Sequence, residues 1–119
     1  HSAPRAPLTV VTGSAEHIAA YIGNQITLYT DEGRTLGILA PLETAGRYHD
    51  ARVIPLGSRL VPRQMSHGLF SALRQMDAWG VDAILAEGIA PHGEGLAFMN
   101  RLLRAAGFAT VDADREAGV

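Results

Sequence analysis

The alternation of apolar and polar positions is clearest between Leu69 and Gly107. Two segments in this stretch, LFSALRQMDAWG and LAFMNRLLRAAG, have apolar residues three and four positions apart, which is the spacing of one face of a helix. The segment between them, VDAILAEG, is short and almost wholly apolar, as expected of a strand with both faces buried. A glycine-bearing loop, IAPHGEG, follows that strand. The stretch therefore predicts a helix, a strand, a loop and a second helix, which together make one half of a parallel α/β sheet.

The rest of the chain continues this alternation. Strands are expected at residues 8–11, 35–40, 52–56 and 83–86, and a short fifth strand at 109–112. Helices are expected at residues 15–31, 62–79 and 95–106, with a loop or short helix at 41–50. The charged tail DADREAGV is expected to fray. Because strands that alternate with helices imply right-handed crossovers, we predict an α/β fold, a three-layer Rossmann-like sandwich with a mostly parallel sheet of four to five strands.

Each expected helix has an apolar stripe that predicts its buried face. The residues of these stripes are Ile18, Ile22, Ile26 and Tyr29 in the first helix, Leu69, Phe70, Leu73, Met76 and Trp79 in the second, and Leu96, Met99, Leu102, Leu103 and Ala106 in the third. Gly80 and Gly107 follow the second and third helices, where glycine is a common C-terminal cap.

Composition and charge exclude several classes of function. The 119 residues are enough for one domain, and 47% apolar with 18% charged residues is typical of a compact protein. A net charge of −2 with scattered arginines predicts no direct binding of nucleic acid and no membrane surface. The absence of cysteine excludes disulfides and thiol catalysis. With no long apolar run and no signal peptide, we expect a cytoplasmic location, and the oligomeric state stays open.

Two loops at the carboxyl ends of the expected strands are the first places to search for a ligand site, since open parallel sheets bind ligands there. Backbone amides at these helix N-termini could bind an anion through Thr12, Gly13, Ser14, Gly93 and Gly95. The first loop has one glycine where the dinucleotide fingerprint has three, and the chain has no lysine for a Walker motif. A tight turn capped by Ser14, and a flexible loop whose Glu94 complements the helix dipole, are the structural alternatives.

Three polar side chains are candidates for an interface or structural role. Glu87 ends the fourth expected strand, and Asn100 and Arg101 are neighbours on the last helix, so that at most one of that pair can face inward. The five histidines lack the spacing of metal ligands on one helix; they are His1, His17, His49, His67 and His92. No nucleophile-elbow motif occurs either. The residues therefore predict no catalytic side chain, no metal site and no cofactor in this chain.

The first seven residues, HSAPRAP, differ from the rest in containing two prolines, which favour an extended segment. We interpret residues 1–7 as the remnant of an interdomain linker and residues 8–119 as a single Rossmann-like domain. A tag remnant at His1 is the alternative interpretation.

These segments together resemble the C-terminal domain of the two-domain threonylcarbamoyl-AMP synthases of bacteria and archaea. HSAPRAPL is similar to the HYAPRTPL-type linker of that family. Three further family patterns follow in the right order, and the residues that fill them are Leu69, Leu73, Arg74 and Asp77, then Gly80, Asp82, Ile84 and Glu87, then Gly95, Leu96, Asn100, Arg101, Leu102, Ala105 and Ala106. The similarity covers essentially the whole chain and is weakest over residues 16–30 and 43–50.

The resemblance implies a YrdC-like catalytic domain on the same polypeptide. In that family this domain is a nucleotidyltransferase that uses threonine, bicarbonate and ATP with magnesium to make threonylcarbamoyl-adenylate for tRNA modification. Its motifs are absent here, so no catalytic residue carries over, and the chain alone is not expected to be an enzyme. The accessory domain is expected to pack on the catalytic domain and to gate its cleft through the linker, with His1, Ser2, Ala3 and Pro4 in contact. Ser2 stands where the family linker usually has a tyrosine. This replacement would remove the aromatic contact that the linker offers to the active site.

Two other interpretations stay open from the residues alone. The chain could be a free-standing Rossmann-like module that binds a nucleotide or another small molecule at the two glycine-bearing loops. The third interpretation is a small enzyme that uses Glu87.

Overall fold

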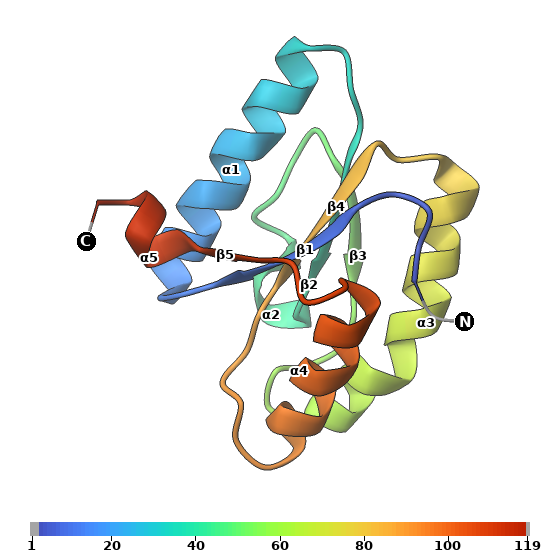
Figure 1. Ribbon diagram of the computed structural model, residues 1–119, viewed down its shortest axis with the longest axis vertical. Coiled ribbons are helices and arrows are strands. Elements are labelled where there is room, and N and C mark those ends of the chain that lie inside the picture. The colour runs from blue at the N-terminus through green and yellow to red at the C-terminus, as the bar shows by residue number, and fades with distance from the viewer. Residues whose placement is uncertain (1–2, 119) are drawn as a thin grey trace.

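The computed structural model describes residues 3–118, and a five-stranded sheet is its central element (Figure 1). The strands are β1 (Leu8–Thr12), β2 (Leu36–Ala40), β3 (Arg52–Pro55), β4 (Ala83–Glu87) and β5 (Thr110–Asp112). Their spatial order is β3-β2-β4-β1-β5, and every neighbouring pair is parallel. The predicted α/β fold with a parallel sheet is therefore confirmed.

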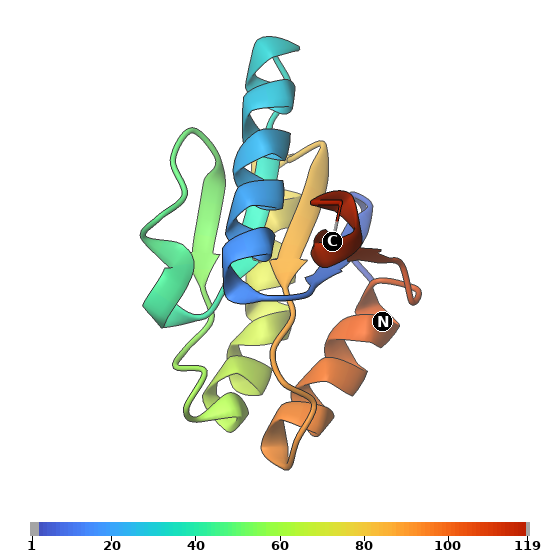
Figure 2. The same ribbon diagram turned by 90° about the vertical axis from the view of Figure 1, so that its left-hand side faces the viewer.

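Helices cover both faces of the sheet and complete three layers (Figures 1 and 2). The helices α1 (Ala15–Asp31), α2 (Leu42–Ala45) and α5 (Ala113–Glu116) pack on one face. The other face is covered by α3 (Pro62–Trp79) and α4 (Glu94–Ala105), which also contact each other. None of the described helices has the length and apolarity needed to cross a membrane.

The core has two halves because successive strand residues face opposite layers. On β1, Leu8 and Val10 pack toward α3 and α4, whereas Val11 packs toward α1. The central strand β2 is buried along its whole length. At Gly37 a Cβ atom would lie 2.5 Å from the Met76 sulfur, so the missing side chain is what lets α3 lie this close to β2.

The ends of two helices follow the sequence signals closely. Ser14 is the N-cap of α1, and its side chain accepts a hydrogen bond from the His17 amide. Gly80 follows α3 with a φ of 68°, and its amide donates to the carbonyl of Met76. That left-handed conformation suits glycine, since it has no Cβ atom to clash.

Three side chains that the apolar stripes predicted to be buried are exposed, and three more, Tyr29, Leu103 and Ala106, are only partly buried. Phe70 and Trp79 are each 38% exposed and Leu96 is 48% exposed. The buried faces differ in membership from the stripes: that of α3 consists of Met65, Ser66, Leu69, Ala72, Leu73 and Met76, and that of α4 of Gly95, Phe98, Met99, Leu102 and Ala105. Leu96 follows the buried Gly95 in sequence and lies outside this face of α4. Trp79 lies in the last turn of α3, under the guanidinium of Arg52.

The expectation of a frayed C-terminal tail was wrong for most of its length. Residues Ala113–Glu116 form α5, with the Asp112 side chain as N-cap that accepts hydrogen bonds from the amides of Asp114 and Arg115. Ala113 is 1% exposed and belongs to the same core cluster as Ile18 and Ile22 of α1. One buried small residue and one cap thus order a segment whose composition is mostly charged and small.

Candidate functional site

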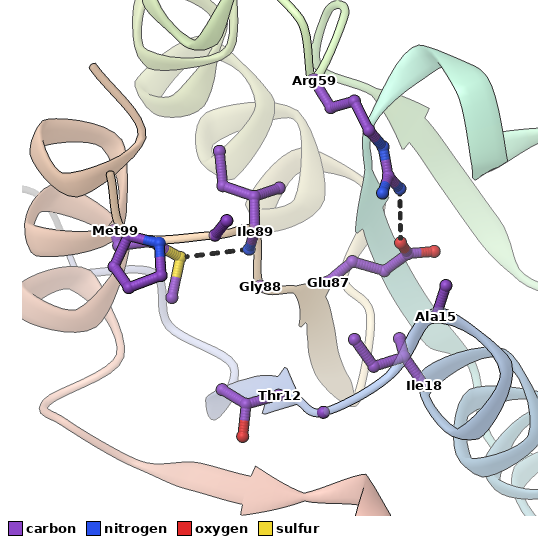
Figure 3. A pocket seen from close by; sticks show the side chains of 11 residues that line it. Thr12, Ala15, Ile18, Arg59, Glu87, Gly88, Ile89 and Met99 are labelled. Atoms are coloured by element: carbon purple, nitrogen blue, oxygen red, sulfur yellow. Dashed lines mark hydrogen bonds and ion pairs between the residues drawn. The ribbon is translucent and has the colours of Figure 1, made fainter. Parts of the chain in front are cut away.

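A cleft of about 420 Å³ lies where β1 and β4 end side by side (Figure 3). The chain leaves β1 toward α1 on one face of the sheet and leaves β4 toward α4 on the other face, so the two connections diverge. Such a divergence is the usual ligand position of open parallel sheets. The cleft is lined by Thr12, Gly13, Ala15, Ile18, Arg59, Glu87, Gly88, Ile89, Ala90, Pro91 and Met99.

Glu87 is the buried carboxylate of this cleft. It is 5% exposed at the end of β4. Its Oε1 accepts a hydrogen bond from the hydroxyl of Thr44 at 3.0 Å, and its Oε2 accepts one from the hydroxyl of Tyr48 at 2.5 Å. Burial, the hydrogen bond to Glu87 and the negative charge of Glu87 raise the pKa of Tyr48 far above its ordinary value. The tyrosine hydroxyl therefore remains a donor, and the carboxylate stays where the two hydroxyls hold it.

Arg59 faces Glu87 from the loop between β3 and α3 (Figure 3). Its Nη2 lies 3.7 Å from Glu87 Oε1, which is longer than a charge-assisted hydrogen bond. Its Nε is buried and has no hydrogen-bond acceptor within the described part of the chain. The guanidinium is thus close to an anion without being saturated by it.

Glu43 holds the loop that presents Arg59. Its carboxylate accepts hydrogen bonds from the Ser58 hydroxyl at 2.5 Å and from the Arg59 amide at 2.9 Å. The hydrogen bond from Ser58, and to a smaller extent that from Arg59, lower the pKa of Glu43 below its ordinary value. An exposed carboxylate thereby fixes the backbone on one side of the cleft.

The opposite wall of the cleft offers one weakly engaged amide. The amide of Ile89 donates to the sulfur of Met99 at 3.4 Å, and thioether sulfur is a weak acceptor. The Thr12 hydroxyl is occupied by the carbonyl of Val111 at 3.3 Å. Most of the remaining lining side chains are apolar.

The loop of Thr12, Gly13 and Ser14, which sequence reasoning proposed for an anion, faces a carboxylate of the chain itself. The Ser14 amide donates to Asp114 Oδ1 at 3.0 Å, and His17 Nδ1 lies 2.7 Å from the same oxygen. The hydrogen bond from the Ser14 amide, and to a smaller extent that from His17, lower the pKa of Asp114 below its ordinary value. Gly13 has a φ of 125°, and a Cβ there would lie 3.0 Å from Asp114 Oδ1. The first candidate amide is therefore already bonded to an internal anion.

Gly93 and Gly95, the other proposed anion contacts, do not line the cleft. Gly93 precedes α4 with a φ of 55°, and the Gly95 amide donates to the carbonyl of His92. A Cβ at Gly95 would collide with the carbonyl oxygen of Ala90. The structure accounts for both glycines by backbone conformation and close approach. It brings the first loop and residues 89–91 of the second loop together at the cleft, but not Gly93 and Gly95.

The remaining candidate residues lie away from the cleft lining. Asn100 and Arg101 are both exposed on α4, and Arg101 borders a shallow groove with Arg63 and Glu94. Ala3 is exposed and Pro4 is half-buried near the beginning of the chain, whereas His1 and Ser2 lie outside the described residues. Between residues 3 and 118, no group of three or more His, Cys, Asp or Glu is placed to hold a metal ion.

Sequence reasoning identified Glu87 but missed its partners Arg59, Thr44 and Tyr48. Arg59 could have been found, because it follows the carboxyl end of the third expected strand. Thr44 and Tyr48 lie in residues 41–50, for which the sequence predicts a loop or short helix, and no periodicity there places a side chain.

Comparison with known proteins places this fold in a family. The family model described as "Threonylcarbamoyl-AMP synthase, C-terminal domain" matches residues 1–107. A threonylcarbamoyl-AMP synthase of Pyrococcus abyssi is 39% identical over 108 residues, which are 91% of this chain and 30% of the relative. That of Bacillus subtilis is 42% identical over 107 residues, which are 90% of this chain and 30% of the relative. The chain thus spans about 30% of the length of these curated relatives.

Solved structures agree with the sequence match. The crystal structure of P. abyssi Sua5 complexed with L-threonine has a TM-score of 0.80 and 37% identity, and the match covers 94% of this chain and 31% of that one. The C-terminal Sua5 domain from Pyrococcus horikoshii has a TM-score of 0.72 and 34% identity, with 92% of this chain and 99% of that one covered. The chain therefore belongs to the family of threonylcarbamoyl-AMP synthase C-terminal domains.

Proposed function

We propose that this chain is the non-catalytic accessory domain of a cytoplasmic threonylcarbamoyl-AMP synthase, a nucleotidyltransferase of tRNA threonylcarbamoyladenosine biosynthesis. The observation that carries the proposal is the coverage: a domain of this fold accounts for about 30% of relatives named for that activity. The remaining length of the relatives is where we assign the YrdC-like catalytic domain, with its ATP, magnesium, threonine and bicarbonate.

The segment before β1 supports a role for residues 1–7 as a linker to that domain. The Arg5 amide donates to Asp77 Oδ1 on α3 at 2.9 Å, and the Pro7 carbonyl accepts from the Ile84 amide at 2.8 Å. Ala6 packs against the core cluster beneath α3 and α4. The chain is thus attached to the domain from Arg5 onward, so the domain can set the direction in which the preceding residues leave.

The proposed mechanism is conformational. A linker held by Asp77 would direct residues 1–4 across the ATP and threonine cleft of the catalytic domain when the two domains pack together. Closure of such a cleft excludes water and protects a hydrolysable adenylate intermediate. In this mechanism no residue of the present chain makes or breaks a bond.

Apolar surface for the partner is available at the carboxyl edge of the sheet. Leu42 is 62% exposed and Leu60 is 83% exposed. The two are held near each other, since the Leu42 amide donates to Gly57 and the adjacent Glu43 binds Ser58 and Arg59. We assign the catalytic domain of the same polypeptide as the partner that covers them.

Pyrophosphate release from ATP, with threonine and bicarbonate present, tests this role. The catalytic domain would be expressed separately and assayed alone and with this chain added. We expect no release by this chain alone and a changed rate when it is added. Turnover by this chain alone, or no effect on the catalytic domain at any ratio, would refute the accessory role.

The Asp77→Ala variant makes the test specific for the linker anchor. It removes the acceptor of the Arg5 amide, so we expect it to lose the effect on the catalytic domain while remaining folded. Asp31→Ala, at the exposed end of α1, is the matched control and should behave like the unmodified chain. Equal behaviour of both variants would show that the anchor at Asp77 has no part in gating.

A free-standing nucleotide-binding module is the second candidate function. The observation in its favour is the cleft at the ends of β1 and β4, where the two connections diverge. Two carboxylates weigh against a nucleotide: Glu87 lines the cleft, and Asp114 already binds the Ser14 amide. Thermal unfolding with ATP or AMP distinguishes the two functions, since a ligand at a hundredfold excess over Kd stabilises by about 2.7 kcal/mol.

A further inference from the structure

The cleft holds two opposite charges that do not saturate each other. Arg59 Nη2 and Glu87 Oε1 are 3.7 Å apart, and Arg59 Nε is buried without an acceptor among the described residues. Glu87 accepts one hydroxyl at each oxygen, whereas a carboxylate has about four lone-pair sites. The guanidinium therefore has at least one donor that Glu87 does not engage, and the Glu87 carboxylate has unused lone-pair sites.

A backbone donor belongs to a lining residue on the opposite wall of the same cleft (Figure 3). Between residues 3 and 118, the Ile89 amide has only the Met99 sulfur as its partner, at 3.4 Å. An oxygen acceptor would replace that weak bond with a normal one. The cleft thus offers one donor without a partner among the described residues, Arg59 Nε, and one weakly bonded donor, the Ile89 amide, together with the Glu87 carboxylate.

The walls around these groups suit a small apolar side chain. Ile18 and Ala15 line one side, and Met99, Ile89 and Ala90 line the other. The cleft volume of about 420 Å³ lies in the range of small-molecule sites.

The same groups disfavour a phosphate. A dianion in the cleft would be repelled by Glu87, and the Ser14 amide that could bind it already donates to Asp114. A ligand with both a negative and a positive group meets no such repulsion.

We propose that the cleft binds a free α-amino acid with a small or branched apolar side chain. Its carboxylate would accept from Arg59 and from the Ile89 amide, and its ammonium group would donate to Glu87. The apolar side chain would then pack among Ile18 and Met99. This site belongs to residues of the present chain alone, so it stands or falls independently of any packing on a catalytic domain.

Calorimetric titration of the 119-residue chain tests the proposal. The probes are L-alanine, L-valine and L-isoleucine, whose side chains are small or branched and apolar. N-acetyl-L-valine lacks the ammonium group and L-valinamide lacks the carboxylate. We expect saturable binding of at least one amino acid, with roughly 10- to 100-fold weaker binding of both blocked forms, because each loses a charge-assisted bond.

Arg59→Gln is the matched variant, and Arg63→Gln is its control. Arg63 lies four residues further on, is exposed and does not line the cleft. We expect Arg59→Gln to weaken amino-acid binding by roughly tenfold or more and Arg63→Gln to leave it unchanged. Should Arg59→Gln fail to fold, the comparison of free and blocked amino acids on the unmodified chain decides.

Three results would overturn the amino-acid site. They are the absence of saturable heat with all three amino acids, equal binding of free and blocked valine, and equal binding by the two arginine variants. Saturable binding of ATP or inorganic phosphate in place of the amino acids would identify the cleft as an anion site instead.

Discussion

Two carboxylates, Glu87 in the cleft and Asp114 behind the β1–α1 loop, are held in different ways. On the β4 side, Glu87 is 5% exposed and accepts from two hydroxyl groups of the β2–β3 connection. On the β1 side, the Asp114 side chain is 41% exposed and binds the Ser14 amide and His17. Water can replace the partners of an exposed carboxylate, whereas it cannot reach those of a buried one. The β4 side should therefore govern folding stability, and the β1 side should respond mainly to pH and backbone changes.

The largest effect is expected for Glu87→Ala. The substitution removes the acceptor of the buried Tyr48 hydroxyl and one of the two acceptors of the buried Thr44 hydroxyl. It also removes the anion beside the partly exposed guanidinium of Arg59. We expect a loss of about 3 kcal/mol in the free energy of unfolding, measured by urea denaturation. Glu16→Ala, at an exposed position in the first turn of α1, should cost less than about 1 kcal/mol.

A double-mutant cycle sharpens this prediction. Tyr48→Phe removes one donor to Glu87, and it should cost clearly less in the Glu87→Ala background than in the unmodified chain. Equal costs in both backgrounds would mean that Tyr48 and Glu87 do not stabilise each other, and the contrast between the two sides would fail.

A glycine pair on the β1 side should show effects of opposite sign. Gly13 has a φ of 125° and would place a Cβ against Asp114, so Gly13→Ala should destabilise by about 2 kcal/mol. Gly23 lies within α1 with nothing near its missing Cβ, so Gly23→Ala should stabilise by roughly 0.5–1 kcal/mol. Thermal unfolding of both variants measures the difference. A neutral Gly13→Ala would show that the Asp114 contact adjusts without cost.

The smallest effect is expected for Asp114→Asn, and it should depend on pH. Hydrogen bonds from Ser14 and His17 hold the folded pKa of Asp114 below that of an unfolded aspartate, which is about 3.9. Its stabilisation is therefore complete above that unfolded pKa and is lost as the pH falls through the lower folded pKa. Urea denaturation of both proteins at neutral pH and near pH 3 should show a gap that narrows in acid. A gap that widens in acid would contradict the assigned pairing.

The helices and strands of this fold could be predicted from the sequence because their signals are local. The apolar run AILA predicted β4, and Pro62 and Gly80 marked the two ends of α3. The exposure of Phe70 and Trp79 was not readable, since a helical stripe shows periodicity but not how far the neighbouring layer extends. Which apolar residue stays at the rim depends on packing between elements.

The candidate site could be predicted only in part, because its contacts join segments that are far apart in the sequence. Glu87 could be placed at the edge of the sheet by its position after β4, but Thr44 lies 43 residues away in sequence and Tyr48 lies 39. The Asp114 contact spans 100 residues to Ser14, and its segment lies beyond residues 1–107 that match the family model. A tail of charged and small residues gives no periodic signal for the cap and the single buried alanine that order it.

The contact between Gly37 and Met76 has a consequence for how such domains can change over evolution. Any Cβ at position 37 would meet the Met76 sulfur at 2.5 Å, so a substitution at either position alters the space left for the other. Positions that touch in this way tend to co-vary among relatives. Homologues with alanine or serine in place of Gly37 should therefore have a shorter side chain in place of Met76, with the two replacements inherited together.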